Sequence, residues 1–436
     1  LKKEPGIMSF AYPYVGLWGV LNEEEVKDAW YSLQESHGGA LYIHIPFCLS
    51  KCSFCDYASN YVGQNKNNKR SKIFKLYIDA IEREIKLLTP IIKKVKFDAI
   101  YFGGGTPTIF YEKDLERIIK LVISNFQVSP SAEISIEIYP WKKMLQDKLK
   151  LLKNIGVNRV SIGVQDFDDK VIAFTGRKYT GDEATKIVTE AMKLFNTVNI
   201  DLICGLPKQE KWQQTLEKTI NLNPQQVTVQ PFSNRHSGVK FHNQKYKNLL
   251  PDLDQIIKEY TLAYQMLTDA GYTQTSRHLF VKGGEHKYER KISKSIVRLG
   301  IGAHSISLLP KLTYKNFTTL KEYQDTIKIG KLPIEKGFRI GADEAMRSYL
   351  FYSLGADCGR LSLNEKEFLE KFGLRVQDKF SDEVQALEKE GLIKISDDKI
   401  DLTPEGIYFT SVLQRTFYNP EFIRKKEKIY LKGRLS

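Results

Sequence analysis

The sequence predicts an α/β protein with a partial (β/α)6 TIM-like barrel and a C-terminal, mostly helical, winged-helix-like domain. From Gly39 to about Ser307, short β-branched or apolar runs alternate with longer helical patterns, which is typical of βα units around a parallel sheet. Near Leu332-Pro333 this alternation stops. We therefore expect an N-terminal extension over residues 1–38, a barrel domain over 39–332 and a C-terminal domain over 333–436.

Six segments have the composition of buried strands, and six βα units would make an open barrel rather than a closed eight-stranded one. The predicted strands cover residues 40–45, 97–102, 133–138, 159–163, 198–203 and 226–230. Between the first two, apolar residues recur every three or four positions, which predicts a helix with one apolar face. These residues are Ile73, Leu76, Tyr77, Ala80, Ile81, Ile85 and Leu88. We interpret Leu299-Gly300-Ile301-Gly302 as a turn.

The C-terminal part is predicted to form two helices, two short strands and a last helix. Ser362-Leu363-Asn364-Glu365 has the form of a capping box that opens the first helix, and Thr403-Pro404 begins the last one. The order resembles a winged-helix module. Such modules often bind DNA, but the lysines do not cluster on a recognition helix, so we expect a lid or docking role rather than nucleic-acid binding.

Composition indicates a cytoplasmic protein. None of the apolar runs approaches the 18 to 20 residues that a membrane-spanning helix needs, and the start lacks a secretory signal. The net charge of +14 favours either an anionic partner or a set of scattered, solvated lysines such as those over residues 148–153.

Three of the five cysteines are close together, in the order Cys48, Cys52 and Cys55, directly after a predicted strand. Thiolates with this spacing can reach three irons of a cubane cluster, and the absence of a fourth nearby cysteine leaves one iron open to another ligand. The alternatives are a zinc site with His44 as fourth ligand, or three unrelated buried thiols. Cys204 and Cys358 stand alone and are expected to be small buried hydrophobes.

From about Tyr42 to Ser307 the chain resembles the oxygen-independent coproporphyrinogen III oxidase family of radical S-adenosylmethionine (SAM) enzymes, which also includes heme chaperones and class C methyltransferases. Six tracts in the same order carry the resemblance. They are residues 42–55, Gly103-Gly104-Gly105-Thr106-Pro107-Thr108, residues 135–138, Gly156-Val157-Asn158-Arg159, residues 163–167 and residues 199–207.

The resemblance implies a 4Fe-4S cluster on Cys48, Cys52 and Cys55, with SAM on the open iron. A second SAM is possible beside the first, and Tyr42 would lie near the pair as a catalytic and cofactor-binding residue. Carboxylates suit SAM's ribose hydroxyls or ammonium, and Arg177 suits its carboxylate. Phe54 and Ile306 would lie at the adenine. The implied SAM contacts are Tyr42, Phe54, Gly104, Gly105, Thr106, Glu137, Gln165, Arg177, Asp201 and Ile306.

The resemblance to the family does not extend to the residues that are expected to lie on the substrate side of the site. The oxidases have another cysteine where this chain has Tyr57, and the chaperones have a His-Asn-x-x-Tyr-Trp tract where this chain has only His286-Lys287-Tyr288-Glu289. Residues 232–236 also depart from the oxidases.

The resemblance implies oxidative decarboxylation of coproporphyrinogen III or another anionic tetrapyrrole, whose charge would suit Arg235, with flavodoxin or ferredoxin as reductant. The alternatives are a two-SAM methyl or methylene transferase and a heme chaperone. In the chaperone, His236, His286 or His304 would be the candidate heme ligand.

Overall fold

The computed structural model describes residues 11–33, 38–55, 60–62, 68–145, 147–232, 250–283, 285–294, 297–355 and 359–426. The strands are β1 Gly38–Ile45, β2 Phe47–Cys48, β3 Asn60–Tyr61, β4 Lys96–Gly104, β5 Gln127–Ile138, β6 Arg159–Gln165, β7 Thr197–Cys204, β8 Gln226–Pro231, β9 Thr273–Gln274, β10 Leu279–Val281, β11 Arg298–Ile301, β12 Ile306–Leu309, β13 Leu312–Asn316, β14 Ile334–Arg339, β15 Ser362–Asn364, β16 Ile393–Ile395 and β17 Lys399–Leu402.

The helices up to residue 328 are α1 Glu23–Tyr31, α2 Asn68–Leu88, α3 Glu112–Asn125, α4 Lys142–Leu145, α5 Lys148–Asn154, α6 Asp169–Phe174, α7 Gly181–Leu194, α8 Trp212–Leu222, α10 Leu253–Asp269, α11 Lys287–Ser293 and α12 Leu320–Lys328. Those that follow are α13 Ala342–Leu350, α14 Glu365–Phe372, α15 Val376–Lys379, α16 Ser381–Lys389, α17 Pro404–Tyr408 and α18 Thr410–Phe417.

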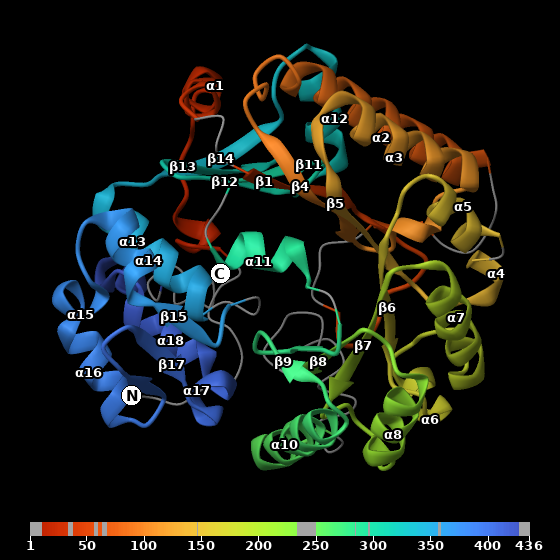
Figure 1. Cartoon of the computed structure of the whole chain (residues 1–436). Coiled ribbons are helices and arrows are strands. Elements are labelled where there is room, and N and C mark those ends of the chain that lie inside the picture. The colour runs from red at the N-terminus through yellow and green to blue at the C-terminus, as the bar shows by residue number, and fades with distance from the viewer. Residues whose placement is uncertain are drawn as a thin grey trace, which may run out of the picture.

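The predicted parallel barrel is confirmed. All six predicted strands form, and they lie side by side in the order β1-β4-β5-β6-β7-β8, with each neighbouring pair parallel. The strands curve around an open centre, with α2, α3, α5, α7 and α8 on the outer side (Figure 1). The outward-facing strand residues are almost completely buried, as expected for a sheet covered by helices.

The sheet is larger than the sequence predicts, because it has twelve strands in the order β14-β13-β12-β11-β1-β4-β5-β6-β7-β8-β10-β9. The interpretation of residues 299–302 as a turn is wrong, since Arg298–Ile301 is strand β11, parallel to β1. Gly300 is needed there for close approach rather than for a turn, because a Cβ would come within 2.6 Å of the Ile306 carbonyl oxygen. Strand β14 continues the sheet past residue 332, so we propose that the barrel domain ends after Arg339.

Helix α11 lies on the concave side of the sheet, unlike the helices that cover its outside (Figure 1). Glu133 of β5 accepts hydrogen bonds from the backbone N–H groups of Lys287 (3.0 Å) and Tyr288 (3.4 Å) in its first turn. Lys291 in its last turn pairs with Asp98 at 2.7 Å. The Glu133 carboxylate at the N-terminus of α11 satisfies N–H groups that have no partner within the helix. These contacts fix α11 inside the barrel.

The C-terminal part forms a small three-stranded sheet, β15-β17-β16, surrounded by short helices. The predicted capping box at Ser362 is wrong, because Ser362 pairs with Asp401 in β15 and is therefore extended. The Asn364 side chain caps α14 instead, by accepting from the Lys366 N–H. The Thr403 cap is confirmed, since its side chain accepts from the Gly406 N–H.

Two further expectations fail. Leu76 is 48% exposed, although it fits the apolar period of α2. Lys148 is 5% exposed, and its Nζ donates to the Thr108 carbonyl oxygen at 2.9 Å, so it is a buried contact to the turn after β4 rather than a solvated lysine.

No helix in the described residues is both long enough and apolar enough to span a bilayer.

Glu84 of α2 is 1% exposed and fixes the loop after β11. It accepts from the Tyr323 hydroxyl (2.5 Å), the Asn316 amide (2.6 Å) and the Gly302 N–H (2.8 Å). Burial raises the pKa of Glu84 to about 7, although these hydrogen bonds oppose the shift.

A raised folded-state pKa means that the folded protein binds more protons than the unfolded chain between about pH 4.5 and 7. The stability of the wild type should therefore fall as pH rises through this window, by up to about 3 kcal/mol from this group. We expect Glu84→Gln to remove that part of the pH dependence of Tm. Glu82→Gln on the same helix is the control, because Lys86 and Arg117 lower the pKa of Glu82. Equal pH slopes for wild type and Glu84→Gln would contradict the expectation.

Candidate active site

The three clustered cysteines line one hollow beside the barrel. Cys48 ends β2, which pairs with β3, and Cys52 and Cys55 lie in the following turn, where the Cys55 N–H donates to the Cys52 carbonyl oxygen at 3.2 Å. All three cysteine side chains are half-buried. The hollow holds about 480 Å³ of empty space, including its open mouth. It is lined by Cys48, Leu49, Ser50, Lys51, Cys52, Cys55, Tyr61, Gly105, Thr106, Tyr139 and Arg177.

The glycine turn after β4 forms one wall of this hollow. The Gly105 N–H donates to the Ile45 carbonyl oxygen and the Thr106 N–H to the Phe47 carbonyl oxygen, both at 2.8 Å. A Cβ on Gly105 would come within 2.6 Å of the Phe47 carbonyl oxygen and 3.0 Å of the Cys48 sulfur. Gly104 has a φ of +115°, which a side chain would disfavour. The turn therefore brings bare backbone against the thiols.

The residues of the hollow fit an iron–sulfur cluster better than a single zinc ion. In the described part of the chain, no three His, Cys, Asp or Glu side chains surround one point as ligands of a single ion would. A cubane cluster instead places each thiolate on a different iron. The zinc alternative also fails at His44, which is 4% exposed, lies outside the hollow and contacts the Tyr42 hydroxyl through Nδ1 at 3.0 Å.

Arg177 lies at the edge of the hollow among three aromatic rings. Its guanidinium is 5.4 Å from the ring centre of Phe54, 5.1 Å from that of Tyr139 and 5.9 Å from that of Tyr179. Nη1 donates to the Gly163 carbonyl oxygen at 2.5 Å, and buried Nε has no hydrogen-bond partner. Arg177 can therefore still bind an anionic group. Gln165 lies beside it, with a φ of +65° and its amide about 2.9 Å from the position of a Cβ on Gly163.

Glu137 and Asp201 lie on the concave side, on strands β5 and β7. Glu137 accepts from the Tyr101 hydroxyl (3.0 Å) and the Gly104 N–H (3.2 Å), so it is tied to the glycine turn. Burial, followed by the charge of Asp201, raises the pKa of Glu137 to about 7. Asp201 accepts from the Ser161 hydroxyl (2.9 Å) and the Asn199 amide (2.6 Å).

Three tyrosines cluster on the concave side. The ring centres of Tyr42, Tyr101 and Tyr288 form a triangle, with 6.2 Å between Tyr42 and Tyr101, 4.8 Å between Tyr101 and Tyr288, and 6.2 Å between Tyr42 and Tyr288. Tyr42, Tyr101 and Tyr288 are each only half-buried, so solvent reaches this inner wall. The sequence analysis did not single out Tyr101, although its inward position follows from the strand period that it shares with Gly103.

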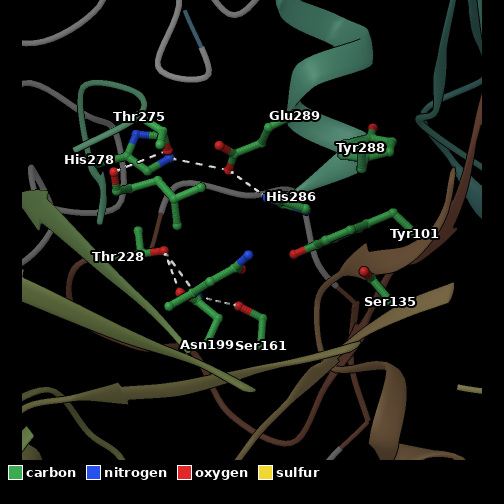
Figure 2. A network of polar contacts seen from close by, with 12 residues as sticks. Tyr101, Ser135, Ser161, Asn199, Thr228, Thr275, His278, His286, Tyr288 and Glu289 are labelled. Atoms are coloured by element: carbon green, nitrogen blue, oxygen red, sulfur yellow. Dashed lines mark hydrogen bonds and ion pairs between the residues drawn. The ribbon is translucent and has the colours of Figure 1, made fainter. Parts of the chain in front are cut away.

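A chain of buried acids and histidines faces this wall (Figure 2). Glu289 lies 3.1 Å from His286 Nδ1 and 3.4 Å from His278 Nε2, and His286 Nε2 lies 3.6 Å from Glu133. Burial would raise the pKa of Glu289, but the two imidazoles outweigh it and hold the pKa well below its ordinary value. The sequence analysis did not identify this arrangement, because Glu133, His278 and Glu289 are far apart in the chain.

The structure brings together most of the predicted SAM contacts, but not all. Phe54 lies with Arg177, and Gly104 lies with Glu137. Ile306 packs in an apolar cluster with Tyr288, and Phe54 packs with Val171 and Ile203, so the prediction that both lie at the adenine of SAM stays a prediction. Tyr57, Arg235, His236 and Cys358 lie outside the described residues.

An open parallel barrel with three cysteines beside a glycine turn at the carboxyl end of its strands defines a class, the radical SAM proteins. The family model of the Radical SAM superfamily matches residues 42–219, and that of the HemN C-terminal domain matches residues 360–409. The cofactors of this class are a 4Fe-4S cluster and SAM.

Whole-chain comparisons narrow the class. The chain is 30% identical over 388 residues to the oxygen-independent coproporphyrinogen III oxidase of Salmonella typhimurium, covering 84% of this chain and 82% of the relative. It is 28% identical over 376 residues to the heme chaperone HemW of Bacillus subtilis, covering 84% and 95%. The solved coproporphyrinogen III oxidase HemN from Escherichia coli superposes with a TM-score of 0.81 at 27% identity, covering 94% of this chain and 96% of that structure. The chain belongs to the oxygen-independent coproporphyrinogen III oxidase-like family of radical SAM proteins.

Proposed function

We propose that the protein removes CO2 oxidatively from propionate side chains of a porphyrinogen, with coproporphyrinogen III as the substrate. The similarity to the Salmonella oxidase carries this proposal, because it covers 82% of the relative and includes both the barrel and the C-terminal part. A hydrogen atom is lost from the β-carbon of the propionate, and the resulting substrate radical then loses CO2 and passes one electron to a separate one-electron acceptor, which leaves a vinyl group.

We assign Cys48, Cys52 and Cys55 as the residues that would hold the 4Fe-4S cluster. Together with SAM, the cluster would supply the hydrogen-atom acceptor for the propionate. The glycine turn at Gly104, Gly105 and Thr106 lets backbone groups approach SAM closely, because no side chain stands between them.

Four polar side chains position SAM in this proposal. Glu137 and Asp201 accept hydrogen bonds from its hydroxyl or ammonium groups, and Arg177 and Gln165 bind at the hollow's edge. Tyr42 lies on the inner wall where substrate and SAM meet. A second SAM would lie beside the first, with Tyr42 near the pair. The one-electron donor is a flavodoxin or ferredoxin, and the proposed location is the cytoplasm.

A heme chaperone is the second candidate, because the chain covers 95% of HemW. His286 is a poor axial heme ligand, since it is 7% exposed and its two ring nitrogens face Glu289 and Glu133. The other described candidate, His304, has a pKa lowered by burial and by Lys315 to about 4, which leaves its imidazole neutral at pH 7. A class C methyl or methylene transferase is the remaining alternative.

Product analysis tests the proposal. The cluster-loaded protein is incubated without oxygen with SAM, dithionite and coproporphyrinogen III, and we expect 5'-deoxyadenosine, CO2 and a vinyl product in matched amounts. A methylated product without CO2 would instead indicate the transferase. An unchanged porphyrinogen, together with a Soret band on addition of heme, would indicate the chaperone.

A further inference from the structure

Arg159 at the start of β6 is a buried cation without a matching anion. It is 2% exposed, and in the described part of the chain no carboxylate lies within ion-pair distance of its guanidinium. Its Nε donates to the Gln226 Oε1 at 2.9 Å, while Nη1 is buried without a hydrogen-bond partner. Burying a charge that is in no direct ion pair is unfavourable. Glu137 is near enough for Arg159 to lower its pKa but does not pair with it directly, so a ligand carboxylate would supply the anion at contact distance.

Gln226 provides a second unsatisfied donor beside it. Its side chain is 0% exposed, and because Oε1 accepts from Arg159, the Nε2 amide is the atom left without a partner. The two groups thus present two N–H donors, Arg159 Nη1 and Gln226 Nε2, on linked side chains. A carboxylate, with two acceptor oxygens and a negative charge, matches this pair.

The strand register places these donors on the wall that carries the proposed site. Arg159 pairs with Ser135, Ser135 with Tyr101, and Tyr101 with Tyr42, so Arg159 shares a row and a face with the two inner tyrosines. A second row runs through Glu137, Ser161, Asn199 and Gln226. Burial and Asp201 raise the pKa of Glu137 and Arg159 partly offsets this, which also places the guanidinium near Glu137.

Partly exposed side chains lie on the same wall as the two donors. Thr228 follows Gln226 by two residues on the same face of β8 and is half-buried, as is Tyr101 in the row of Arg159. A flexible side arm of a ligand held at the mouth of the barrel can therefore reach down this wall. The thiol hollow that would hold SAM is lined by other residues, including Arg177 but neither Arg159 nor Gln226.

We propose that Arg159 and Gln226 form a receptor for one carboxylate of the substrate inside the barrel. This inference rests on the proposed function in that it names a propionate carboxylate of a porphyrinogen as the ligand. One anchored propionate would fix which of the substrate's other side arms faces the radical. The receptor therefore determines both binding of the acid and the position of the reacting arm.

The test is equilibrium binding to the full-length, cluster-loaded protein with SAM. Fluorescence titration compares coproporphyrin III with its tetramethyl ester, which has the same ring without charge. We expect the wild type to bind coproporphyrin III, the free acid, more tightly than its ester. Arg159→Met should bind the free acid about tenfold to a hundredfold more weakly than the wild type does, while its affinity for the ester is unchanged. Lys287→Met is the charge-matched control, because its ammonium bonds the Ser131 carbonyl oxygen on the surface, and it should leave both affinities within about twofold.

Thermal unfolding separates a receptor from a structural arginine. Arg159→Met removes a buried charge but also the hydrogen bond to Gln226, so its Tm should stay close to that of the wild type, whereas a clearly lowered Tm with unchanged affinity for the acid would overturn the proposal. If Arg159→Met does not fold, Arg159→Lys keeps the charge and should still weaken acid binding, because it loses the planar fork.

Binding and product formation have different consequences. A wild-type preference for the acid that is lost in the variants supports the receptor, even if no vinyl product forms. Equal binding of acid and ester by the wild type, or no binding of either, overturns it, even if the vinyl product forms.

Discussion

Replacing Cys52 by alanine is expected to abolish formation of 5'-deoxyadenosine. Cys52 lies in the turn between the other two thiols and lines the same hollow, so its loss leaves one iron of the proposed cluster without a protein ligand. A loop with only two thiolates lacks one of the three protein ligands that such a cluster needs. We expect iron and sulfide content near background after anaerobic reconstitution, and a decrease in 5'-deoxyadenosine of at least about a thousandfold, toward the detection limit.

Cys204 supplies the matched control for this loss. It ends β7, is 0% exposed, and burial raises the pKa of its thiol far above the ordinary value, so it is a buried apolar side chain. Cys204→Ala should keep full iron content and 5'-deoxyadenosine formation, with a modest loss in Tm from the small cavity. Normal iron content in Cys52→Ala would refute the assignment of Cys52.

Replacing Gly105 by alanine is expected to cause the second largest loss. The added methyl would lie 2.6 Å from the Phe47 carbonyl oxygen and 3.0 Å from the Cys48 sulfur, so the backbone beside the cluster ligand must move. A shift of even a fraction of an ångström at a positioned group reduces catalysis strongly, and we expect at least about a hundredfold less 5'-deoxyadenosine.

The variant should nevertheless fold, because Gly105 is in a turn and the sheet core is unchanged. Gly341 is the control position, since nothing lies within 4 Å of a Cβ there and its φ of −78° suits any residue. Gly341→Ala should be indistinguishable from the wild type in both circular dichroism and turnover. Full activity in Gly105→Ala would show that the turn does not approach the cluster or SAM.

Much of the barrel could be predicted from the sequence, because apolar residues recur at the strand period in each predicted run and face the outer helices. Polar residues such as Glu137 and Asn199 alternate with them and face the inside. Strands β11 to β14 were not predicted as strands, because they are four to six residues long and two of them contain glycine. Strand β11 also joins the sheet by pairing with β1, which lies far away in the chain, and local patterns do not carry such a contact.

Some residues of the candidate site could likewise be predicted from the sequence, and others could not. The cysteines and the glycine turn could be predicted because they are compact motifs in the sequence. Arg159, Gln226 and Glu289 could not, since their partners come from other elements and are visible only when strands β5 to β8 and helix α11 are placed around one centre. Ser362 shows the converse error, because a local capping pattern is overridden there by strand pairing with Asp401.

The two ends of the described chain meet. The Lys426 ammonium lies 4.9 Å from the ring centre of Tyr14, and the rings of Tyr12 and Tyr418 are in edge contact at 4.7 Å. A short linker between these two ends of the described chain would therefore close the polypeptide into a ring. The fold would then not depend on which strand or helix comes first in the sequence. New ends opened at an exposed turn such as Gly330 would give a circularly permuted protein with the same barrel.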